Sequence, residues 1–256
     1  MYEAHGLFVQ PENEDVRVWR YMDFTKLVSL IDSQCLYFTR ADKLGDPFEG
    51  SWPKMNVAAR QAIDEYRLSC LPLEYRDGFL KSRELIKPSL SDGPQYYAVN
   101  CWHVNEHESA AMWKLYLKSD EGIAIQSTYK KLRDAIIDDE TVYLGLIKYI
   151  DYDHDSIEVA NNMFSPFLHK RKSFEHEKEV RALIAKMPME CNDVGIYQDT
   201  IANGVKIRVD IELLIEKIYV APSTPDWFSE LIRAVVQRYE YHLEVVHSKL
   251  DEQAVF

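Results

Sequence analysis

Glycine is scarce in this chain, with nine among 256 residues. The sequence contains no glycine-rich phosphate loop of the P-loop or dinucleotide-fold type, no G-x-S-x-G nucleophile elbow and no H-E-x-x-H motif. Since such motifs cradle phosphates, expose a nucleophilic serine or bind zinc, their absence disfavours kinases, dinucleotide-fold dehydrogenases and serine hydrolases. The chemistry that remains is that of carboxylates assisted by arginine and aromatic side chains.

Cysteines and long apolar runs are also rare. The four cysteines, Cys35, Cys70, Cys101 and Cys191, are far apart and form no C-x-x-C pair, and the polar, acidic first residues do not predict a signal peptide. This usage is typical of a reducing compartment, so we expect a cytoplasmic protein. No apolar run approaches the roughly 18 residues that a membrane span requires, so no membrane partner is expected.

Positive charge is in deficit. Lysine and arginine number 30 against 42 aspartates and glutamates, a formal net charge of −12, and the one compact basic run is His169-Lys170-Arg171-Lys172. A protein that coats nucleic acid usually presents a basic domain or face, so the composition argues against that class. A local guanidinium site is still compatible with this charge.

The apolar residues predict strands that alternate with helices. With 46% hydrophobic and 28% charged residues, the chain is an ordinary globular mixture. The spacings predict a single α+β domain over 1–256 with a central mixed or antiparallel sheet, and a helical insertion at 54–94. Core strands are expected at 16–21, 35–39, 96–102, 122–127 and 177–184, further strands at 142–149, 206–209 and 218–220, and further helices at 108–117, 129–137 and 226–239.

The densest carboxylate cluster is Glu175-His176-Glu177-Lys178-Glu179-Val180-Arg181. Periodicity alone allows a helix or a strand there. On a strand, Glu177 and Glu179 project together, so that repulsion raises one pKa and the pair can grip two hydroxyls of a sugar. On a helix, the segment is a solvated face with i,i+4 pairs such as Glu177 with Arg181. The sheet predicted above includes this segment as a strand.

The loop at 40–52 offers a second pair of carboxylates. Gly45, Pro47 and Gly50 give this loop the turn chemistry of a fixed path, and Asp46 and Glu49 lie between the glycines. Asp46 is expected to cap backbone amides, whereas Glu49 has no such local role and is a candidate site residue.

The region at 101–116 carries possible ligands and aromatic side chains. Cys101-x-His103-x3-His107 has metal-like spacing, but Asn105 and Glu106 indicate a turn and no fourth ligand is evident, so no metal is expected. Trp113 and Tyr116 fall at helical spacing with Met112, a pattern typical of core packing that could also line a cleft.

Four segments together resemble a widespread prokaryotic domain family of unknown function. They are WRYMDFTKLVSLI, LYFTRADKLGDPFEG, the CW pair with MWKLYLKSDEGIAI, and KRKSFEHEKEVRALI, and they run from Trp19 to about Ile184. The marks are a DPFE loop, W-x2-Y before a G-[IV] strand, and a late E-x-E-[WV]-R. Val180 replaces the usual aromatic residue and Gly45 the usual asparagine, departures that affect packing more than chemistry.

A second similarity links the order of Arg20, Ser127-Thr128 and Glu177-x-Glu179 to ADP-ribosyltransferases of the Arg-Ser-Glu type. The resemblance implies a split-sandwich fold of that superfamily and NAD as substrate. It also implies that Arg20 contacts phosphate and Ser127 orders the nicotinamide pocket, with Tyr21, Trp113 and Tyr116 beside the nucleotide. Glu179 would stabilise the oxocarbenium ion and Glu177 would orient the acceptor, as the chemistry of guanidinium and carboxylate allows.

The resemblance therefore implies an NAD-cleaving enzyme that modifies a protein or nucleic-acid acceptor, as a toxin or phage-defence effector would. Two alternatives stay open. One is a Mg²⁺-dependent nuclease or phosphohydrolase with Asp46, Glu49, Glu177 and Glu179 as oxygen ligands, although Lys178 would point away from both late glutamates. The other is a non-catalytic binding or regulatory module in which a buried glutamate to Arg181 network only holds the fold.

Overall fold

A mixed sheet forms the centre of the protein. The computed structural model describes residues 1–91, 93–116, 121–158, 163–186 and 201–254, and in these residues nine strands join in one sheet. The path runs β11-β10-β4-β1-β3-β2-β9, and β8 and β5 continue from β3. The strands are β1 Arg17–Asp23, β2 Cys35–Arg40, β3 Tyr97–Val104, β4 Gly122–Thr128, β5 Tyr143–Leu146, β8 Glu179–Ala185, β9 Gly204–Arg208, β10 Lys217–Val220 and β11 Glu244–His247. All neighbours pair antiparallel except β10 with β11, and β6 (Lys148–Ile150) pairs with β7 (His169–Arg171) in a separate parallel ribbon.

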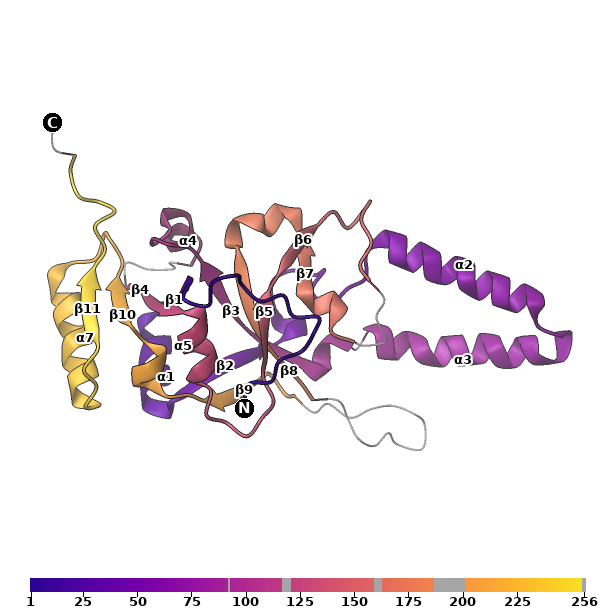
Figure 1. Cartoon of the computed structure of the whole chain (residues 1–256), viewed down its shortest axis with the longest axis horizontal. Coiled ribbons are helices and arrows are strands. Elements are labelled where there is room, and N and C mark those ends of the chain that lie inside the picture. Colours follow the sequence, from indigo (N-terminus) through magenta and orange to yellow (C-terminus); the bar gives the residue numbers. More distant parts are fainter. Residues whose placement is uncertain (92, 117–120, 159–162, 187–200, 255–256) are drawn as a thin grey trace.

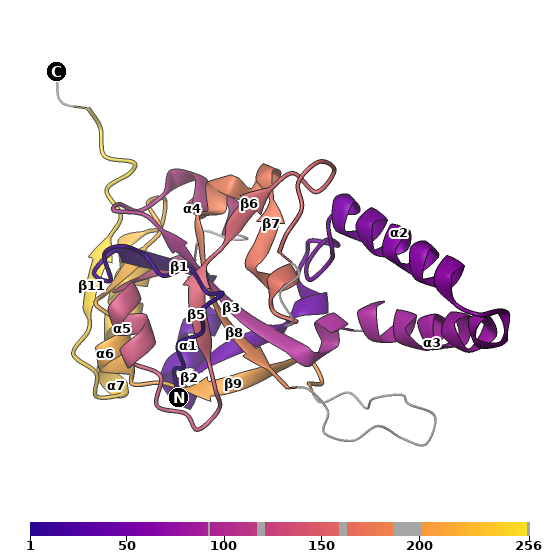
Figure 2. The same ribbon diagram turned by 45° about the vertical axis from the view of Figure 1, so that its right-hand side comes forward.

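Two of the helices project away from this sheet (Figure 1, Figure 2). Figure 1 shows α2 and α3 projecting together from one end of the molecule, while α7 and β11 lie at the opposite end, and Figure 2 shows the same arrangement from a second angle. The helices are α1 Phe24–Ser33, α2 Lys54–Cys70, α3 Leu73–Ser91, α4 Ala110–Tyr116, α5 Tyr129–Asp134, α6 Ile211–Leu214 and α7 Asp226–Arg238, with 3₁₀ helices at Ala41–Lys43, Gly93–Tyr96, Ser165–Leu168 and Lys172–Glu177. Among the described residues, no helix combines the length and apolarity that crossing a bilayer requires. Cys35, Cys70 and Cys101 are free thiols; Cys191 lies outside the described residues.

Alternation along β1 explains the two sides of the sheet. Val18 and Met22 enter the main hydrophobic core, which also holds the buried residues of α1. Trp19 and Tyr21 point to the other side and form a smaller cluster with Trp113 of α4. The period-2 pattern that predicts this strand therefore also assigns each side chain to its face.

Two of the predicted strands differ from the structure by more than small shifts of their ends. The expected strand at 177–184 begins only at Glu179, because a 3₁₀ helix runs through Glu177 and Lys178 takes a left-handed φ of 39° at its end. The expected strand at 142–149 is split into β5 and β6, which pair with β8 and β7 respectively. Both differences arise where the backbone turns, a feature that side-chain periodicity does not report.

The central strand β3 forks the sheet. One edge of β3 pairs with β8 from Tyr97 to His103. The other edge pairs with β1 only at His103 and Val104, and with β2 only at Ala98 and Val99. Residues 100–102 therefore lie between two diverging strands, and this fork is where polar side chains gather.

The loop that carries Glu49 passes close to Phe167. Gly50 has a φ of +70°, and a Cβ built on it would lie 2.8 Å from Cζ of Phe167 and closer still to Cε1. A residue with a side chain at this position would be strained and would overlap the ring.

We expect Gly50→Ala to lower the free energy of unfolding by about 2–4 kcal/mol, because positive-φ strain and overpacking add. Gly78→Ala is the matched control: Gly78 lies in α3 with nothing within 4 Å of the new Cβ, so alanine should be neutral or stabilising by up to about 1 kcal/mol. Urea denaturation of both variants measures the difference, and equal stabilities would contradict the packing of this loop.

Candidate functional site

Arg20 bridges the fork in the sheet. Its Nη1 donates hydrogen bonds to the carbonyl of Cys101 at 2.8 Å and to Oδ1 of Asn100 at 2.9 Å. Asn100 in turn donates from Nδ2 to the carbonyl of Tyr37 on β2, at 2.9 Å, and accepts from Nε1 of Trp102 at 2.7 Å. These side chains replace the strand-to-strand bonds that residues 100–102 lack on this edge. No described residue accepts from Nε or Nη2 of Arg20.

A cavity of about 400 Å³ opens at this fork. It receives side chains from β1, α1, β2, β3 and α4, and from Glu177 and Glu179. Its walls are mostly apolar and aromatic, with cations at Arg20, Lys26 and Lys206 and carboxylates at the two glutamates. The lining residues are Trp19, Arg20, Tyr21, Met22, Lys26, Ser29, Leu30, Ser33, Cys35, Leu36, Tyr37, Thr39, Leu44, Val99, Cys101, Trp102, His103, Met112, Tyr116, Glu177, Glu179 and Lys206.

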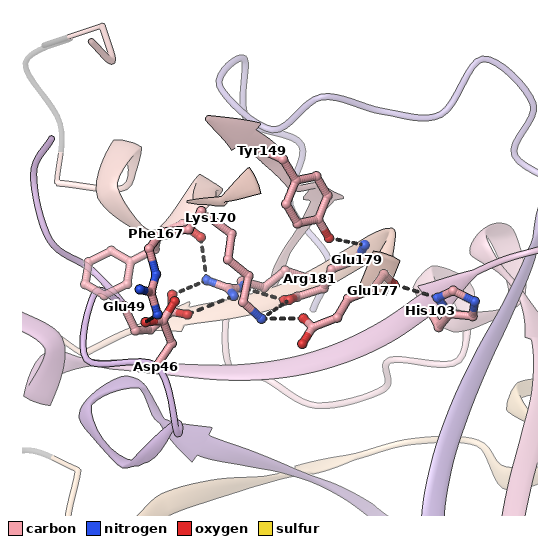
Figure 3. Close-up of polar contacts among 10 residues, drawn as sticks. Asp46, Glu49, His103, Tyr149, Phe167, Lys170, Glu177, Glu179 and Arg181 are labelled. Atoms are coloured by element: carbon pink, nitrogen blue, oxygen red, sulfur yellow. Dashed lines mark hydrogen bonds and ion pairs between the residues drawn. The ribbon is translucent and has the colours of Figure 1, made fainter. Parts of the chain in front are cut away.

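Behind the cavity, Arg181 holds two glutamates. Its side chain is fully buried on β8, and Nε donates to Oε1 of Glu179 at 2.6 Å. Nη2 donates to Oε2 of Glu49 at 3.1 Å, and Nη1 donates to the other oxygen of Glu49 and to the carbonyl of Phe167 at 2.7 Å. Figure 3 shows the guanidinium between the two carboxylates. Since Glu179 and Arg181 share one face of β8, the strand itself brings this pair together.

Lys170 joins the two late glutamates. Its ammonium group lies 3.2 Å from Oε2 of Glu179 and also pairs with Glu177 (Figure 3). Tyr149 accepts a hydrogen bond from the backbone N–H of Glu179 at 2.8 Å. Glu177 lies in the 3₁₀ helix, so the two carboxylates converge on a shared lysine and not along one strand face. This corrects the expectation that both project from a strand.

The two carboxylates that share Arg181 have pKa values shifted in opposite directions. Burial raises the pKa of Glu179, but the charges of Arg181 and Lys170 outweigh it and lower the pKa to about 2. Burial also raises the pKa of Glu49, and there Arg181 offsets it only in part. Glu179 is therefore held ionised, and Glu49 is the more easily protonated of the two.

Asp46 has a local role in its loop. It accepts a hydrogen bond from the backbone N–H of Phe48 at 3.0 Å and pairs with Nη2 of Arg171 at 2.7 Å. The Arg171 guanidinium lies 4.4 Å from the ring centroid of Phe48. The capping expected of Asp46 agrees with the first contact.

The structure brings together some of the predicted site residues. Arg20 and Glu179, far apart in sequence, line one cavity with Tyr21, Tyr116 and Glu177. Glu49, Arg181 and Asp46 are not among its lining residues. Lys170 and Asn100 were not predicted as site residues, although Lys170 belongs to the basic run at 169–172. His103 was singled out only for its metal-like spacing with Cys101 and His107.

Ser127 and Trp113 do not reach the cavity. Ser127 is fully buried on β4, on the same face as Ile123 and Ile125 of the main core, and its hydroxyl contacts the carbonyl of Thr128. Trp113 is 2% exposed, packs edge-on against Tyr21 and donates from Nε1 to Glu108 at 2.9 Å. Trp113 is therefore packed in a hydrophobic cluster, as its helical spacing with Met112 also predicted.

The acidic residues do not form an evident metal site. In the described part of the chain, no three His, Cys, Asp or Glu side chains converge as metal ligands would. Asp46, Glu49, Glu177 and Glu179 are each paired with arginine or lysine, which compete with a hard cation for the same oxygens. Nδ1 of His103 contacts the carbonyl of Glu177 at 2.6 Å, so it is not directed toward Cys101 and His107.

We expect Glu49 and Glu179 to titrate on opposite sides of the ordinary glutamate pKa of 4.5. Because the pKa of Glu179 is lowered on folding, its contribution to stability is complete above about pH 4.5 and is lost as pH falls toward 2. The raised pKa of Glu49 has the opposite sign: the folded state takes up this proton first.

A ¹³C NMR titration of the glutamate side-chain carboxyls, assigned with Glu49→Gln and Glu179→Gln, measures this order. Protonation of Glu179 before Glu49 would contradict the described network.

The comparisons with known proteins find only distant likeness. No protein-family model matches the sequence, and no curated protein matches it. Among solved structures, DarT of Thermus sp. 2.9 in complex with NAD⁺ is similar at a TM-score of 0.41 and 8% identity, covering 94% of this chain and 98% of that one. The same DarT in complex with ADP-ribosylated ssDNA is similar at a TM-score of 0.40 and 9% identity, covering 94% and 97%. A likeness this distant carries no argument about chemistry.

Proposed function

We propose that this chain binds NAD in the cavity at the sheet fork and transfers ADP-ribose from it to an acceptor. The observation that carries the proposal is that Arg20 and Glu179 line one cavity. The reaction requires a group that binds phosphate and a group that stabilises a cation. A guanidinium and a carboxylate in one cavity meet these two requirements. The cavity, at about 400 Å³, lies within the range of roughly 300–1,000 Å³ for small-molecule sites.

Arg20 is suited to the diphosphate. Its Nη1 is fixed by Asn100 and Cys101, which leaves Nε and Nη2 for a ligand that enters the cavity. A guanidinium held in this way offers a phosphate its donors with little loss of side-chain entropy. Lys26 and Lys206 add positive charge to the same cavity wall.

Glu179 is suited to the reacting ribose. When the glycosidic C–N bond breaks, its electron pair leaves with nicotinamide and positive charge develops at C1 of the ribose. A carboxylate that Arg181 and Lys170 keep ionised can stabilise that charge, and the acceptor oxygen or nitrogen then bonds to C1 and loses its proton. Glu177 is paired with the same Lys170, and we assign to it the role of orienting the acceptor.

Aromatic side chains complete the cavity. Tyr21 and Tyr116 line the cavity with aromatic rings against which a nicotinamide or adenine ring can pack. Ser127, which the sequence resemblance places at the nicotinamide pocket, is left out of this proposal because it is buried in the core.

The acceptor in this proposal is a protein or a nucleic-acid nucleophile, and a defence effector or toxin is the biological role that the sequence resemblance implies. A net charge of −12 favours an acceptor recognised by local contacts over one held by a broad basic face. The metal-dependent nuclease is less well supported, since its four proposed ligands are already ion-paired.

The non-catalytic alternative has one specific observation in its favour, the fully buried pair of Arg181 and Glu49. This pair holds the loop at 46–49 against β8, and nothing in it reaches the cavity. The experiment must therefore separate loss of structure from loss of a site.

We expect Glu179→Gln to lower nicotinamide release from NAD by about 10²- to 10³-fold, because the charge that faces the developing cation is removed. Glu49→Gln is the matched control: it removes one carboxylate from the same Arg181 but lies outside the cavity. Both variants should lose roughly 1–3 kcal/mol of unfolding free energy, but only Glu179→Gln should lose turnover.

Nicotinamide release is followed by chromatography with protein and nucleic-acid acceptors, and stability by thermal denaturation. Equal activity in the two variants at equal stability would assign the network to the fold alone. No release by the wild-type protein with any acceptor would overturn the transferase.

A further inference from the structure

The cavity at the fork extends across several strands of the sheet. β8 and β2 pair with opposite edges of β3, and β9 pairs with the far edge of β2. Glu179 of β8 and Lys206 of β9 both line the cavity, so its two ends are three strand spacings apart, on the order of 14 Å. The Arg20 guanidinium binds the carbonyl of Cys101 in the fork beside β2, and it therefore lies between these ends.

Tyr37 presents an uncovered aromatic ring near the β9 end. It alternates along β2 with the core residues Leu36 and Phe38, so its side chain lies on the other face of the sheet, where it is 45% exposed and lines the cavity. The tip of the ring rests on Gly204, because a Cβ built on Gly204 would lie 2.6 Å from both Cζ and Oη of Tyr37. Among the described residues no second ring packs against it. The ring is therefore held from one side and is open to a ligand.

Lys206 places a free positive charge beside this ring. It is the register partner of Tyr37, its side chain is exposed, and no residue in the described part of the chain pairs with its ammonium group. Lys26 of α1 also lines the cavity, but Asp23 lies 3.0 Å from its ammonium group and offsets that charge. The carboxylates among the described lining residues are the two glutamates of the opposite end. The β9 end therefore attracts anions.

We propose that the end of the cavity at Tyr37 and Lys206 binds the adenosine half of the dinucleotide and accepts a phosphate on its 2′ oxygen, so that NADP binds more tightly than NAD. The inference rests on the proposed function for the dinucleotide and for the reacting ribose at Glu179. Across the cavity, Glu179, Arg20 and Tyr37 follow one another in the order of that ribose, the diphosphate and the adenine. An exposed aromatic ring is a stacking surface for a base, and an unpaired ammonium group binds a phosphate.

The group near the 2′ oxygen decides between NAD and NADP. In dinucleotide-binding folds, a carboxylate at this place accepts a hydrogen bond from the 2′-hydroxyl of NAD, whereas a cation accommodates the 2′-phosphate of NADP. A carboxylate there would also repel the phosphate. The β9 end of this cavity has the cation, and the carboxylates that line the cavity in the described residues lie at the other end. Its charge therefore favours the phosphorylated form.

The test of the charge is calorimetric binding of NAD, NADP and adenosine 2′,5′-bisphosphate, with the melting temperature of each variant measured in parallel. We expect the wild-type protein to bind NADP about tenfold more tightly than NAD, which corresponds to one charge-assisted contact. Lys206→Gln should bind NADP about tenfold more weakly and NAD within about twofold of the wild type. Lys206→Arg, the matched control, keeps the charge and should keep the preference.

The test of the ring uses the same three ligands. Tyr37→Leu should weaken all of them by about tenfold, because each carries the adenine that loses its stacking surface. Tyr37→Phe is the matched control: it keeps the ring and should bind within about twofold of the wild type. Since Tyr37 is half-exposed, both variants should melt near the wild type.

A wild-type protein that binds NAD as tightly as NADP, or a folded Tyr37→Leu variant with wild-type affinities, would overturn the inference. The expected binding without nicotinamide release from NAD or NADP would end the transferase proposal and leave this nucleotide site standing. Nicotinamide release from NAD that Tyr37→Leu leaves unchanged in KM and kcat would do the reverse. A wild-type protein that binds none of the three ligands would overturn both.

Discussion

The free edge of β3 at residues 100–102 is the constraint on which the site depends. β1 and β2 both pair with this edge, but each takes only one end of it. The carbonyls between them would be buried without donors, at a cost of about 1–3 kcal/mol each. Arg20 and Asn100 supply the missing hydrogen bonds. The same contacts fix the Arg20 guanidinium at the cavity wall. The hydrogen bonds that complete the sheet therefore also hold a cation where a ligand can bind.

On the other side of β3, ion pairs with an arginine and a lysine hold three glutamates in place. Glu49, Glu177 and Glu179 share the two cations Arg181 and Lys170, which come from separate segments of the chain. Removing one partner from a buried pair is costly because the other charge is left unsolvated. These ion pairs therefore link the loop at 46–49, the ribbon strand β7 and the strand β8 to one another. This small network has one negative charge more than it has positive charges, a balance that suits a reaction in which positive charge develops nearby.

The sequence predicts the strands better than the site. The alternation at 16–21 and the apolar run at 122–127 predict β1 and β4 within two residues of their ends, because both strands contribute to the main core. The pairing of Glu179 with Arg181 also follows from a period of two. Glu177 does not, since the left-handed turn at Lys178 interrupts the pattern and no side-chain spacing reports it.

The spacing of residues in the sequence does not predict which distant side chains meet in the fold. The fork depends on which strands share an edge, and nothing local to Asn100 indicates that its amide joins β2 to Arg20. The buried position of Ser127 likewise depends on the core that covers β4. The resemblance to ADP-ribosyltransferases named Arg20 and Glu179, but only the fold brings them to one cavity.

A crystal structure of the wild-type protein soaked with NAD tests this account most directly. The account predicts the dinucleotide in the cavity at the fork, its diphosphate within hydrogen-bond distance of Nε or Nη2 of Arg20, and its nicotinamide ribose facing Glu179. A cavity that stays empty at saturating NAD, or a nucleotide bound elsewhere on the molecule, would contradict it.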